Sequence, residues 1–249
     1  MPGFFVNTMI VLFTDFGIEG PYIGQVKASL NNSLPQCTII DLFSDLPPFN
    51  PQAAAVLLAA YSDGFPAGTV FLCVVDPGVG MAARRPVVLK SKECWFVGPD
   101  NGLFDLLLKY DGESKWWTID WRPEQLSNTF HGRDLFAPIA AEIESGMVPL
   151  DKLSSLELPD LEMLGSDYPY IAYIDHYGNV ITGLRSGFLA EDVILKINGH
   201  EITYARTFGE VGEQSLFWYK NSNGLLEVAA NCGSAAKMLN AAVGDAIGY

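Results

Sequence analysis

The sequence lacks the features of a membrane protein and of a disulfide-rich secreted protein. No apolar run approaches the roughly 20 residues needed to cross a bilayer, and the first residues lack the basic segment and cleavage site of a signal peptide. The four cysteines are scattered and form no C-x-x-C pair; they are Cys37, Cys73, Cys94 and Cys232. We therefore expect a cytoplasmic protein whose thiols are free.

Positive charge and histidine are both scarce. Lysine and arginine number 15 against 29 aspartates and glutamates, which gives a net charge of −14 at pH 7. Such a surface repels phosphate backbones, so we expect no nucleic-acid partner. The three histidines show no metal-ligand spacing with one another or with nearby carboxylates, so the sequence requires no metal.

Several well-known catalytic and phosphate-binding motifs are missing as well. No G-x-G-x-x-G motif follows the first predicted strand and no Walker A loop is present, which argues against sites for dinucleotides and nucleoside triphosphates. There is no G-x-S-x-G motif of the kind that carries a nucleophilic serine. Carboxylates and histidine remain the candidates for chemistry.

The hydrophobic pattern that is present predicts two domains. In residues 1–150, compact apolar runs that end in polar or glycine turns alternate with helical segments, which indicates an α/β domain with a mostly parallel sheet. Residues 151–166 are polar without a firm period and are predicted to be a linker. Residues 167–249 contain short strand-like runs between turn signals and few helices. We expect this C-terminal domain to be a small antiparallel β-barrel.

Two aspartates and one histidine stand where an α/β domain binds ligands. Asp15 follows the predicted strand 9–13, and Asp76 follows the predicted strand 69–75. Ligands of open α/β sheets bind outside the carboxyl ends of the strands, although such aspartates also cap helices or brace turns. His131, just before a helical segment, is either a general base or a histidine held for structure. The residues alone predict a small-molecule α/β enzyme.

A set of motifs in a fixed order resembles the S-adenosyl-L-methionine (SAM) hydroxide adenosyltransferase family, whose relatives include fluorinases and chlorinases. The resemblance runs from residue 12 to about residue 235. The motifs are LFTDFG (12–17), YIGQVK (22–27), VVDPGVG (74–80), GPDNGL (98–103), TFHGRD (129–134), DHYGNV (175–180), NSNG (221–224) and LEVAAN (226–231). The resemblance implies an N-terminal α/β domain and a C-terminal β-barrel, in agreement with the division inferred from the hydrophobic pattern.

The resemblance also implies an activity and its reactive residues. The expected reaction is hydrolysis of SAM to adenosine and methionine, by attack of water or hydroxide on the ribose C5′ atom, with no cofactor. The family's reactive aspartate and histidine fall on Asp76 and His131. Its arginine falls in the Arg-Arg-Pro stretch, where counting back from the proline selects Arg84; Arg85 is the alternative, because the preceding segment is one residue longer than usual.

The family's binding residues map to both predicted domains. By the resemblance, Asp15 binds the ribose hydroxyls, Asn179 and Ser222 face the methionine portion, and Phe208 and Asn231 contact the adenine. The resemblance further implies a homotrimer, with each site between the N-terminal domain of one subunit and the C-terminal domain of the next.

Two other functions remain open on the same sequence. The first is a SAM-dependent halogenase; Asp76 argues against it, because a carboxylate at the nucleophile's position repels a halide. The second is a non-catalytic protein that binds adenosine or SAM. The combination of Asp76, an arginine and His131 favours catalysis, because a binding protein needs no groups that handle water.

Overall fold

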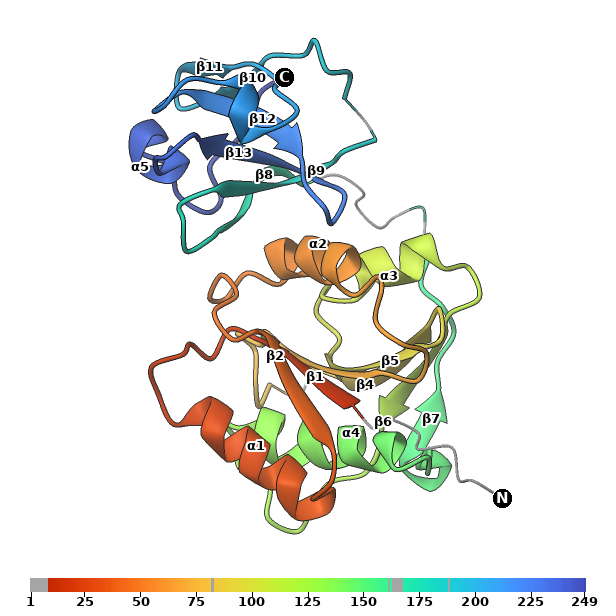
Figure 1. The fold of residues 1–249 in the computed structure, drawn as a ribbon. Coiled ribbons are helices and arrows are strands. Elements are labelled where there is room, and N and C mark those ends of the chain that lie inside the picture. Colours follow the sequence, from red (N-terminus) through yellow and green to blue (C-terminus); the bar gives the residue numbers. More distant parts are fainter. Residues whose placement is uncertain (1–8, 82, 161, 163–167, 188) are drawn as a thin grey trace, which may run out of the picture. The chain divides into compact units, whose positions relative to one another are not determined.

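The computed structural model describes residues 9–81, 83–160, 162, 168–187 and 189–249. The chain divides into two compact units, which are residues 1–51 with 64–164, and residues 52–63 with 165–249 (Figure 1). Part of the predicted linker 151–166, namely residues 161 and 163–166, lies outside the described residues. No described helix is both long enough and apolar enough to cross a bilayer.

A seven-stranded sheet forms the centre of the first unit, in the order β2-β1-β3-β5-β4-β6-β7. Its strands β2, β1, β3 and β5 pair in parallel, whereas β4 and β7 run antiparallel to their neighbours. Five of the seven strands therefore point the same way, and the predicted mostly parallel α/β sheet is confirmed. The strands are β1 (Met9–Thr14), β2 (Thr38–Phe43), β3 (Val70–Val74), β4 (Pro86–Ser91), β5 (Cys94–Pro99), β6 (Lys115–Ile119) and β7 (Leu153–Ser155).

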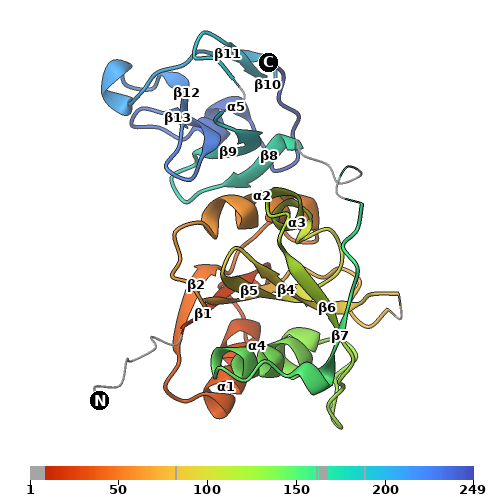
Figure 2. The ribbon, with the colours of Figure 1, turned by 90° about the vertical axis from the view of Figure 1, so that its right-hand side faces the viewer.

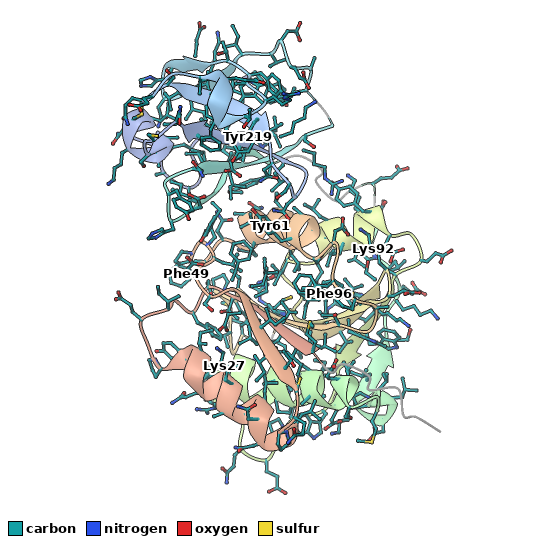
Figure 3. All side chains as sticks on the ribbon, in the orientation of Figure 1. Lys27, Phe49, Tyr61, Lys92, Phe96 and Tyr219 are labelled. Carbon is teal, nitrogen blue, oxygen red and sulfur yellow. The ribbon has the colours of Figure 1, made fainter. Side chains whose placement is uncertain are left out.

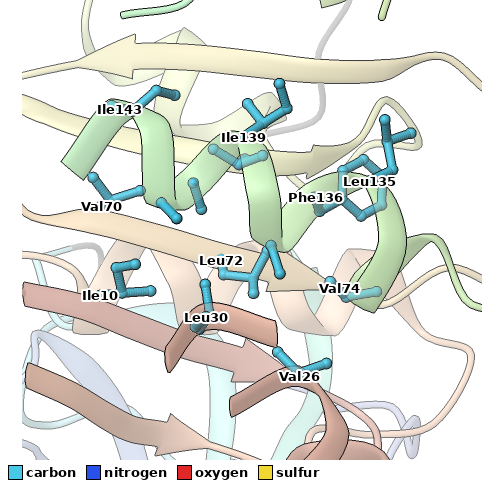
Figure 4. Packing of buried hydrophobic residues seen from close by; sticks show 14 of the residues in the cluster. Ile10, Val26, Leu30, Val70, Leu72, Val74, Leu135, Phe136, Ile139 and Ile143 are labelled. Atoms are coloured by element: carbon cyan, nitrogen blue, oxygen red, sulfur yellow. The ribbon is translucent and has the colours of Figure 1, made fainter. Parts of the chain in front are cut away.

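Helices α1 (Tyr22–Ser33) and α4 (Ala137–Glu144) cover one face of this sheet, and α3 (Asp105–Tyr110) lies on the other face (Figure 2). Side chains of β1 and β3, such as Ile10 and Leu72, pack against Leu30 of α1 and Ile139 of α4 (Figure 4). All five residues of β3 are buried. A strand covered on both faces needs apolar residues throughout, which explains the continuous apolar runs in the sequence.

The pairing of β1 with β3 sets the position of the candidate site. Thr14 at the end of β1 lies opposite Val74 at the end of β3, and the backbone N–H of Asp15 donates to the Val74 carbonyl at 3.3 Å. The segments that carry Asp15 and Asp76 therefore leave the sheet at the same edge, side by side.

The second unit is built on antiparallel strands. A four-stranded sheet has the order β12-β13-β9-β8, and β10 pairs with β11. The unit's core surrounds Trp218, which is fully buried. Helix α2 (Pro51–Tyr61) groups largely with this unit. The other elements are β8 (Tyr168–Ile174), β9 (Val180–Arg185), β10 (Leu195–Ile197), β11 (His200–Ile202), β12 (Leu216–Lys220), β13 (Leu225–Ala230) and α5 (Ala235–Leu239).

The predicted antiparallel β domain is confirmed, but the expected closed barrel is not found among its described residues. Isolated bridges take the place of the missing ladders: Tyr204 with Trp218, Tyr170 with Ala246, and Lys196 with Gly248. Strands β10 and β11 have only three residues each. Such short strands leave irregular backbone between the two sheets. Single bridges, and not a continuous ladder of hydrogen bonds, therefore connect this part of the unit.

Candidate functional site

Asp15 and Asp76 line one pocket in the first unit. Asp15 accepts a hydrogen bond at its Oδ2 atom from the backbone N–H of Phe49, at 3.1 Å. Phe49 has a φ of 61°, a left-handed conformation that is unusual for a bulky side chain. The residue is 76% exposed although it lines the pocket. The wall of the pocket also includes Phe16, Phe130 and His131.

His131 is brought to this pocket by an unusual turn of helix. A π-helical turn, Gly132–Phe136, begins directly after it and continues into α4; π-helical turns occur frequently at functional sites. Gly132 permits a close approach, because a Cβ atom there would lie 3.0 Å from the ring of Phe16. The turn therefore holds the His131 imidazole against the ends of β1 and β3.

Arg84 lies beside Asp76. The Nε atom of Arg84 is 3.2 Å from Oδ1 of Asp76, and the Asp76 side chain is only 3% exposed. Oδ1 also accepts from the backbone N–H of Gly78, and a Cβ atom on Gly78 would come within 2.5 Å of the Arg84 guanidinium. The absence of a side chain at residue 78 therefore lets the guanidinium pack over the turn that carries Asp76.

The second arginine points elsewhere. Arg85 pairs with Asp100, with 2.7 Å between its Nη2 atom and Oδ2 of Asp100, and its side chain is 57% exposed. Of the two arginines that the sequence left as alternatives, the structure places Arg84 with Asp76 and His131, and Arg85 with Asp100.

A second pocket adjoins the first and shares Asp76, His131 and Phe136 with it. Arg84 and Arg122 both line this second pocket. Arg122 is fixed by its Nη1 atom, which donates to the carbonyls of Ile119 at 2.6 Å and Trp121 at 2.8 Å. Neither Arg122 nor Phe49 is predicted from the sequence, because neither belongs to a recognisable motif.

Burial and charge shift the pKa values of the three central groups. Burial raises the pKa of Asp76 above its usual value, while Arg84 and the Gly78 N–H oppose this shift. Burial also raises the pKa of Asp15, and the nearby Asp76 adds to the effect. The pKa of His131 is lowered by burial and by Arg122, against the opposing charge of Asp76. Such coupled shifts in one pocket are typical of functional sites.

One oxygen of Asp76 has no hydrogen-bond partner among the described residues. Oδ2 is buried and unpaired, and the contact of Arg84 Nε with Oδ1 is an ion pair without a hydrogen bond. Buried carboxylate oxygens are nearly always paired. Oδ2 is therefore suited to accept a hydrogen bond from a bound ligand or water.

The other predicted binding residues lie in the second unit. Asn179 is oriented by Asp175, which accepts from its Nδ2 atom at 3.0 Å and from its backbone N–H at 2.8 Å. Asn231 donates through Nδ2 to the carbonyl of Val211 at 2.9 Å. The ring of Phe208 packs edge-on against Phe217 with 5.0 Å between centroids. The structure thus groups Asp15, Asp76, Arg84 and His131 in the first unit and holds Asn179, Phe208, Ser222 and Asn231 on the second.

The side chains of the described residues also bear on metal binding. Among residues 9–81, 83–160, 162, 168–187 and 189–249, no three histidine, cysteine, aspartate or glutamate side chains are arranged to hold a metal ion. Asp76 is instead paired with Arg84, whose guanidinium does not ligate metals.

Both units match known families. The model of the SAM hydroxide adenosyltransferase N-terminal domain matches residues 10–154, and that of the C-terminal domain matches residues 169–248. A Thermus thermophilus protein named (R)-S-adenosyl-L-methionine hydrolase is 38% identical over 92% of this chain and 94% of its own length. A fluorinase from Nocardia brasiliensis is 25% identical over 96% of this chain and 95% of its own length.

A solved structure agrees with these matches. An uncharacterized conserved protein from Thermotoga maritima has a TM-score of 0.85 and 33% identity, covering 96% of this chain and 99% of its own. The resemblance inferred from the ordered motifs is therefore confirmed.

The electrostatics of the site predict how His131 titrates. We expect its pKa to lie below the ordinary value of 6.5, so that the imidazole is neutral at pH 7. Arg122→Ala removes a positive charge and should raise this pKa, whereas Asp76→Asn removes a negative charge and should lower it further. NMR titration of the imidazole measures both effects, with His131→Gln identifying the signal. Arg85→Ala is the control and should leave the titration unchanged; an unchanged or lowered pKa in Arg122→Ala would contradict this account.

Proposed function

Because the chain belongs to the SAM hydroxide adenosyltransferase family, we propose that it hydrolyses S-adenosyl-L-methionine to adenosine and L-methionine. The observation that carries the proposal is the grouping of Asp76, Arg84 and His131 around a pocket that also contains Asp15. Relatives at 30–38% identity are named as hydrolases of this compound.

The reaction is a displacement at the ribose C5′ atom. The oxygen of water forms a bond to C5′ while the C5′–S bond breaks. The electron pair of the C5′–S bond goes to sulfur. Methionine leaves as a neutral thioether, so no general acid is needed. Alignment of the water with the C5′–S bond lowers the barrier, by about 7–11 kcal/mol in the best cases.

The reactive groups have complementary roles in this scheme. Oδ2 of Asp76, which is buried and without a partner among the described residues, accepts a hydrogen bond from the attacking water and orients it. His131, neutral because of its lowered pKa, takes the proton that the water loses and passes it to solvent. Arg84 opposes the effect of burial on the pKa of Asp76 and so favours the ionised carboxylate. Water is the only co-substrate, so the proposed reaction needs no cofactor.

The substrate is held along its length by residues of both units. In this proposal the Asp15 carboxylate binds the ribose hydroxyls, a role supported by its place in the same pocket as Asp76 and His131. Asn179 and Ser222 face the methionine portion, and Phe208 and Asn231 contact the adenine. The net charge of −14 favours a sulfonium cation over an anionic substrate.

The relatives' name also bears on stereochemistry. Those hydrolases are named for (R)-S-adenosyl-L-methionine. The prefix L already specifies the α-carbon, so (R) describes the sulfonium centre. We therefore propose the sulfonium epimer with R configuration as the substrate of this protein.

Halogenation is the runner-up function, because fluorinases occur among the more distant relatives. The carboxylate of Asp76, with one oxygen unpaired among the described residues, repels a halide at the position where the nucleophile must stand. Non-catalytic binding of adenosine or SAM is the third possibility, and it gives no role to the Asp76–Arg84 pair.

An assay with the separate sulfonium epimers tests the function. The purified protein is incubated with (R)- and (S)-sulfonium SAM in chloride-containing and fluoride-containing buffers, and the products are separated by chromatography. We expect adenosine and methionine, formed faster from the R epimer because only one arrangement of the sulfonium substituents places the C5′–S bond in line with the water. A 5′-halo-5′-deoxyadenosine would identify a halogenase, and unchanged SAM would identify a binding protein.

The two neighbouring arginines provide a matched pair of variants. Arg84→Ala should lower kcat by about 100-fold or more, because it removes the charge beside Asp76 where the water is oriented. Arg85→Ala removes an exposed ion pair with Asp100 and should leave kcat within about twofold. Steady-state kinetics measure both, with melting temperatures to confirm folding. A larger loss in Arg85→Ala than in Arg84→Ala would reverse the assignment.

We also propose that the active form is a homotrimer in the cytoplasm. Two pocket-lining residues, Phe49 and Met81, are 76% and 66% exposed in the single chain, and a nucleoside site needs cover for such apolar groups. The C-terminal unit of a second subunit provides this cover and brings Phe208 and Asn231 with it. No disulfide joins the four cysteines, as suits a reducing compartment.

Complementation between defective chains tests the composite site. His131→Ala inactivates the first-unit half and Asn231→Asp disables the second-unit half. Mixed oligomers should contain some sites in which both halves are intact, so activity should partly return. Refolding the two variants together and comparing the mixture with each variant alone measures this effect. An active monomer by light scattering, or no recovery after verified subunit exchange, would rule out sites between subunits.

A further inference from the structure

A buried carboxylate in the second unit has no part in the scheme above. Glu227 stands in the middle of β13 and is only 7% exposed. Its two oxygens accept hydrogen bonds from uncharged side chains: Oε1 from the hydroxyl of Tyr219, and Oε2 from Nδ2 of Asn221 at 3.0 Å. Burying a carboxylate costs free energy, and an apolar side chain of similar volume is often as stable. Glu227 is therefore not explained by stability alone.

One arm of this network fixes the turn between β12 and β13. Asn221, held by Glu227, accepts at its Oδ1 atom from the backbone N–H groups of Asn223 and Leu225, both at 3.0 Å. Its own N–H donates to the Leu225 carbonyl at 2.9 Å. Ser222 belongs to this turn. The side chain of Asn221 thus determines the shape of the turn, and Glu227 determines the orientation of that side chain.

The other arm leads to an aromatic cluster, which consists of Phe208, Phe217 and Tyr219. The ring centroid of Tyr219 lies 5.8 Å from that of Phe208 and 5.5 Å from that of Phe217. Tyr219 lies within the second unit (Figure 3). Burial and the Glu227 carboxylate raise the pKa of Tyr219, so its hydroxyl remains protonated and donates.

The carboxylate therefore joins two structures that the proposed function uses separately. We propose that Glu227 is a positioning residue that sets the spacing between Ser222, which faces the methionine portion, and Phe208, which contacts the adenine. This inference rests on the proposed function, because SAM must span the distance between the two contacts. The carboxylate is suited to the role because each of its two oxygens binds a donor from a different structure.

Glu227→Gln tests the proposal with little change in size. The oxygen of a carboxamide can still accept from Asn221, and its NH₂ group can donate to the Tyr219 hydroxyl, so two charge-assisted hydrogen bonds become weaker neutral ones. We expect KM for SAM to rise about tenfold, as for the weakening of hydrogen bonds to a charged group, with kcat within about twofold of wild type. Adenosine contacts only the Phe208 side, so its inhibition constant should stay within about twofold. Tyr219→Phe should raise KM in the same direction.

Val228→Ala is the matched control for a purely structural effect. Val228 is adjacent in β13 and fully buried, so this variant should lower the melting temperature and leave KM unchanged. A wild-type KM in Glu227→Gln would overturn the proposal, as would an equal rise in Val228→Ala or an equal loss of adenosine affinity. If Glu227→Gln does not fold, Tyr219→Phe decides the question by the same criteria.

Failure of the proposed function gives a different result. If the wild-type protein does not hydrolyse SAM, calorimetry compares the dissociation constants of SAM and adenosine for wild type and for Glu227→Gln. A selective loss of SAM affinity in the variant would support the positioning role without turnover, and parallel values for the two ligands would overturn it.

Discussion

The candidate site of the first unit depends on one electrostatic constraint, which is that the Asp76 carboxyl group is almost removed from solvent and has the Arg84 guanidinium beside it. The Asp76 side chain is 3% exposed, and burial raises its pKa. The effective cost of burying an unpaired carboxylate is several kcal/mol, and Arg84 offsets it. The sequence accommodates the guanidinium with Gly78, where any side chain would collide with it. The length of the loop between β3 and β4 then determines which of two consecutive arginines reaches the site.

The same constraint governs the neighbouring histidine. His131 lies between the negative charges of Asp76 and Asp134 and the positive charge of Arg122, and its burial favours the neutral form. An imidazole next to a carboxylate would ordinarily become protonated. Desolvation and Arg122 oppose this and lower the pKa of His131, so the neutral form of the imidazole is favoured beside the Asp76 carboxyl group. A neutral imidazole beside a carboxyl group is suited to removing a proton from water.

The sequence predicted those parts of the molecule that are encoded by local patterns. The runs at 9–13 and 69–75 have the length and composition of buried strands, and Asp15 and Asp76 follow directly from where those strands end. Strand β7 was missed because Leu-Ser-Ser has no hydrophobic pattern, and it formed part of the predicted linker. Closure of the barrel was overestimated because the pattern gives the number of strands but not whether their edges pair.

Within the site, the sequence could not reveal what depends on three-dimensional packing. The choice between Arg84 and Arg85 was left open by a spacing of one residue, whereas their partners, Asp76 and Asp100, separate them clearly. Phe49 reaches Asp15 through its backbone N–H in a left-handed conformation, which no side-chain pattern encodes. Arg122 is directed to His131 by two backbone carbonyls, and these are also invisible in the sequence.

The hydrogen bonds of two buried acids, Asp76 and Glu227, indicate different roles for them. Asp76 has a cation at one oxygen and no partner among the described residues at the other, so its remaining capacity is available to a ligand. Glu227 has a donor at each oxygen and therefore holds protein groups together. Burial alone does not distinguish these cases, since both side chains are nearly inaccessible. Unused hydrogen-bonding capacity distinguishes the two acids. A buried acceptor without a protein partner costs free energy unless a ligand or water donates a hydrogen bond to it.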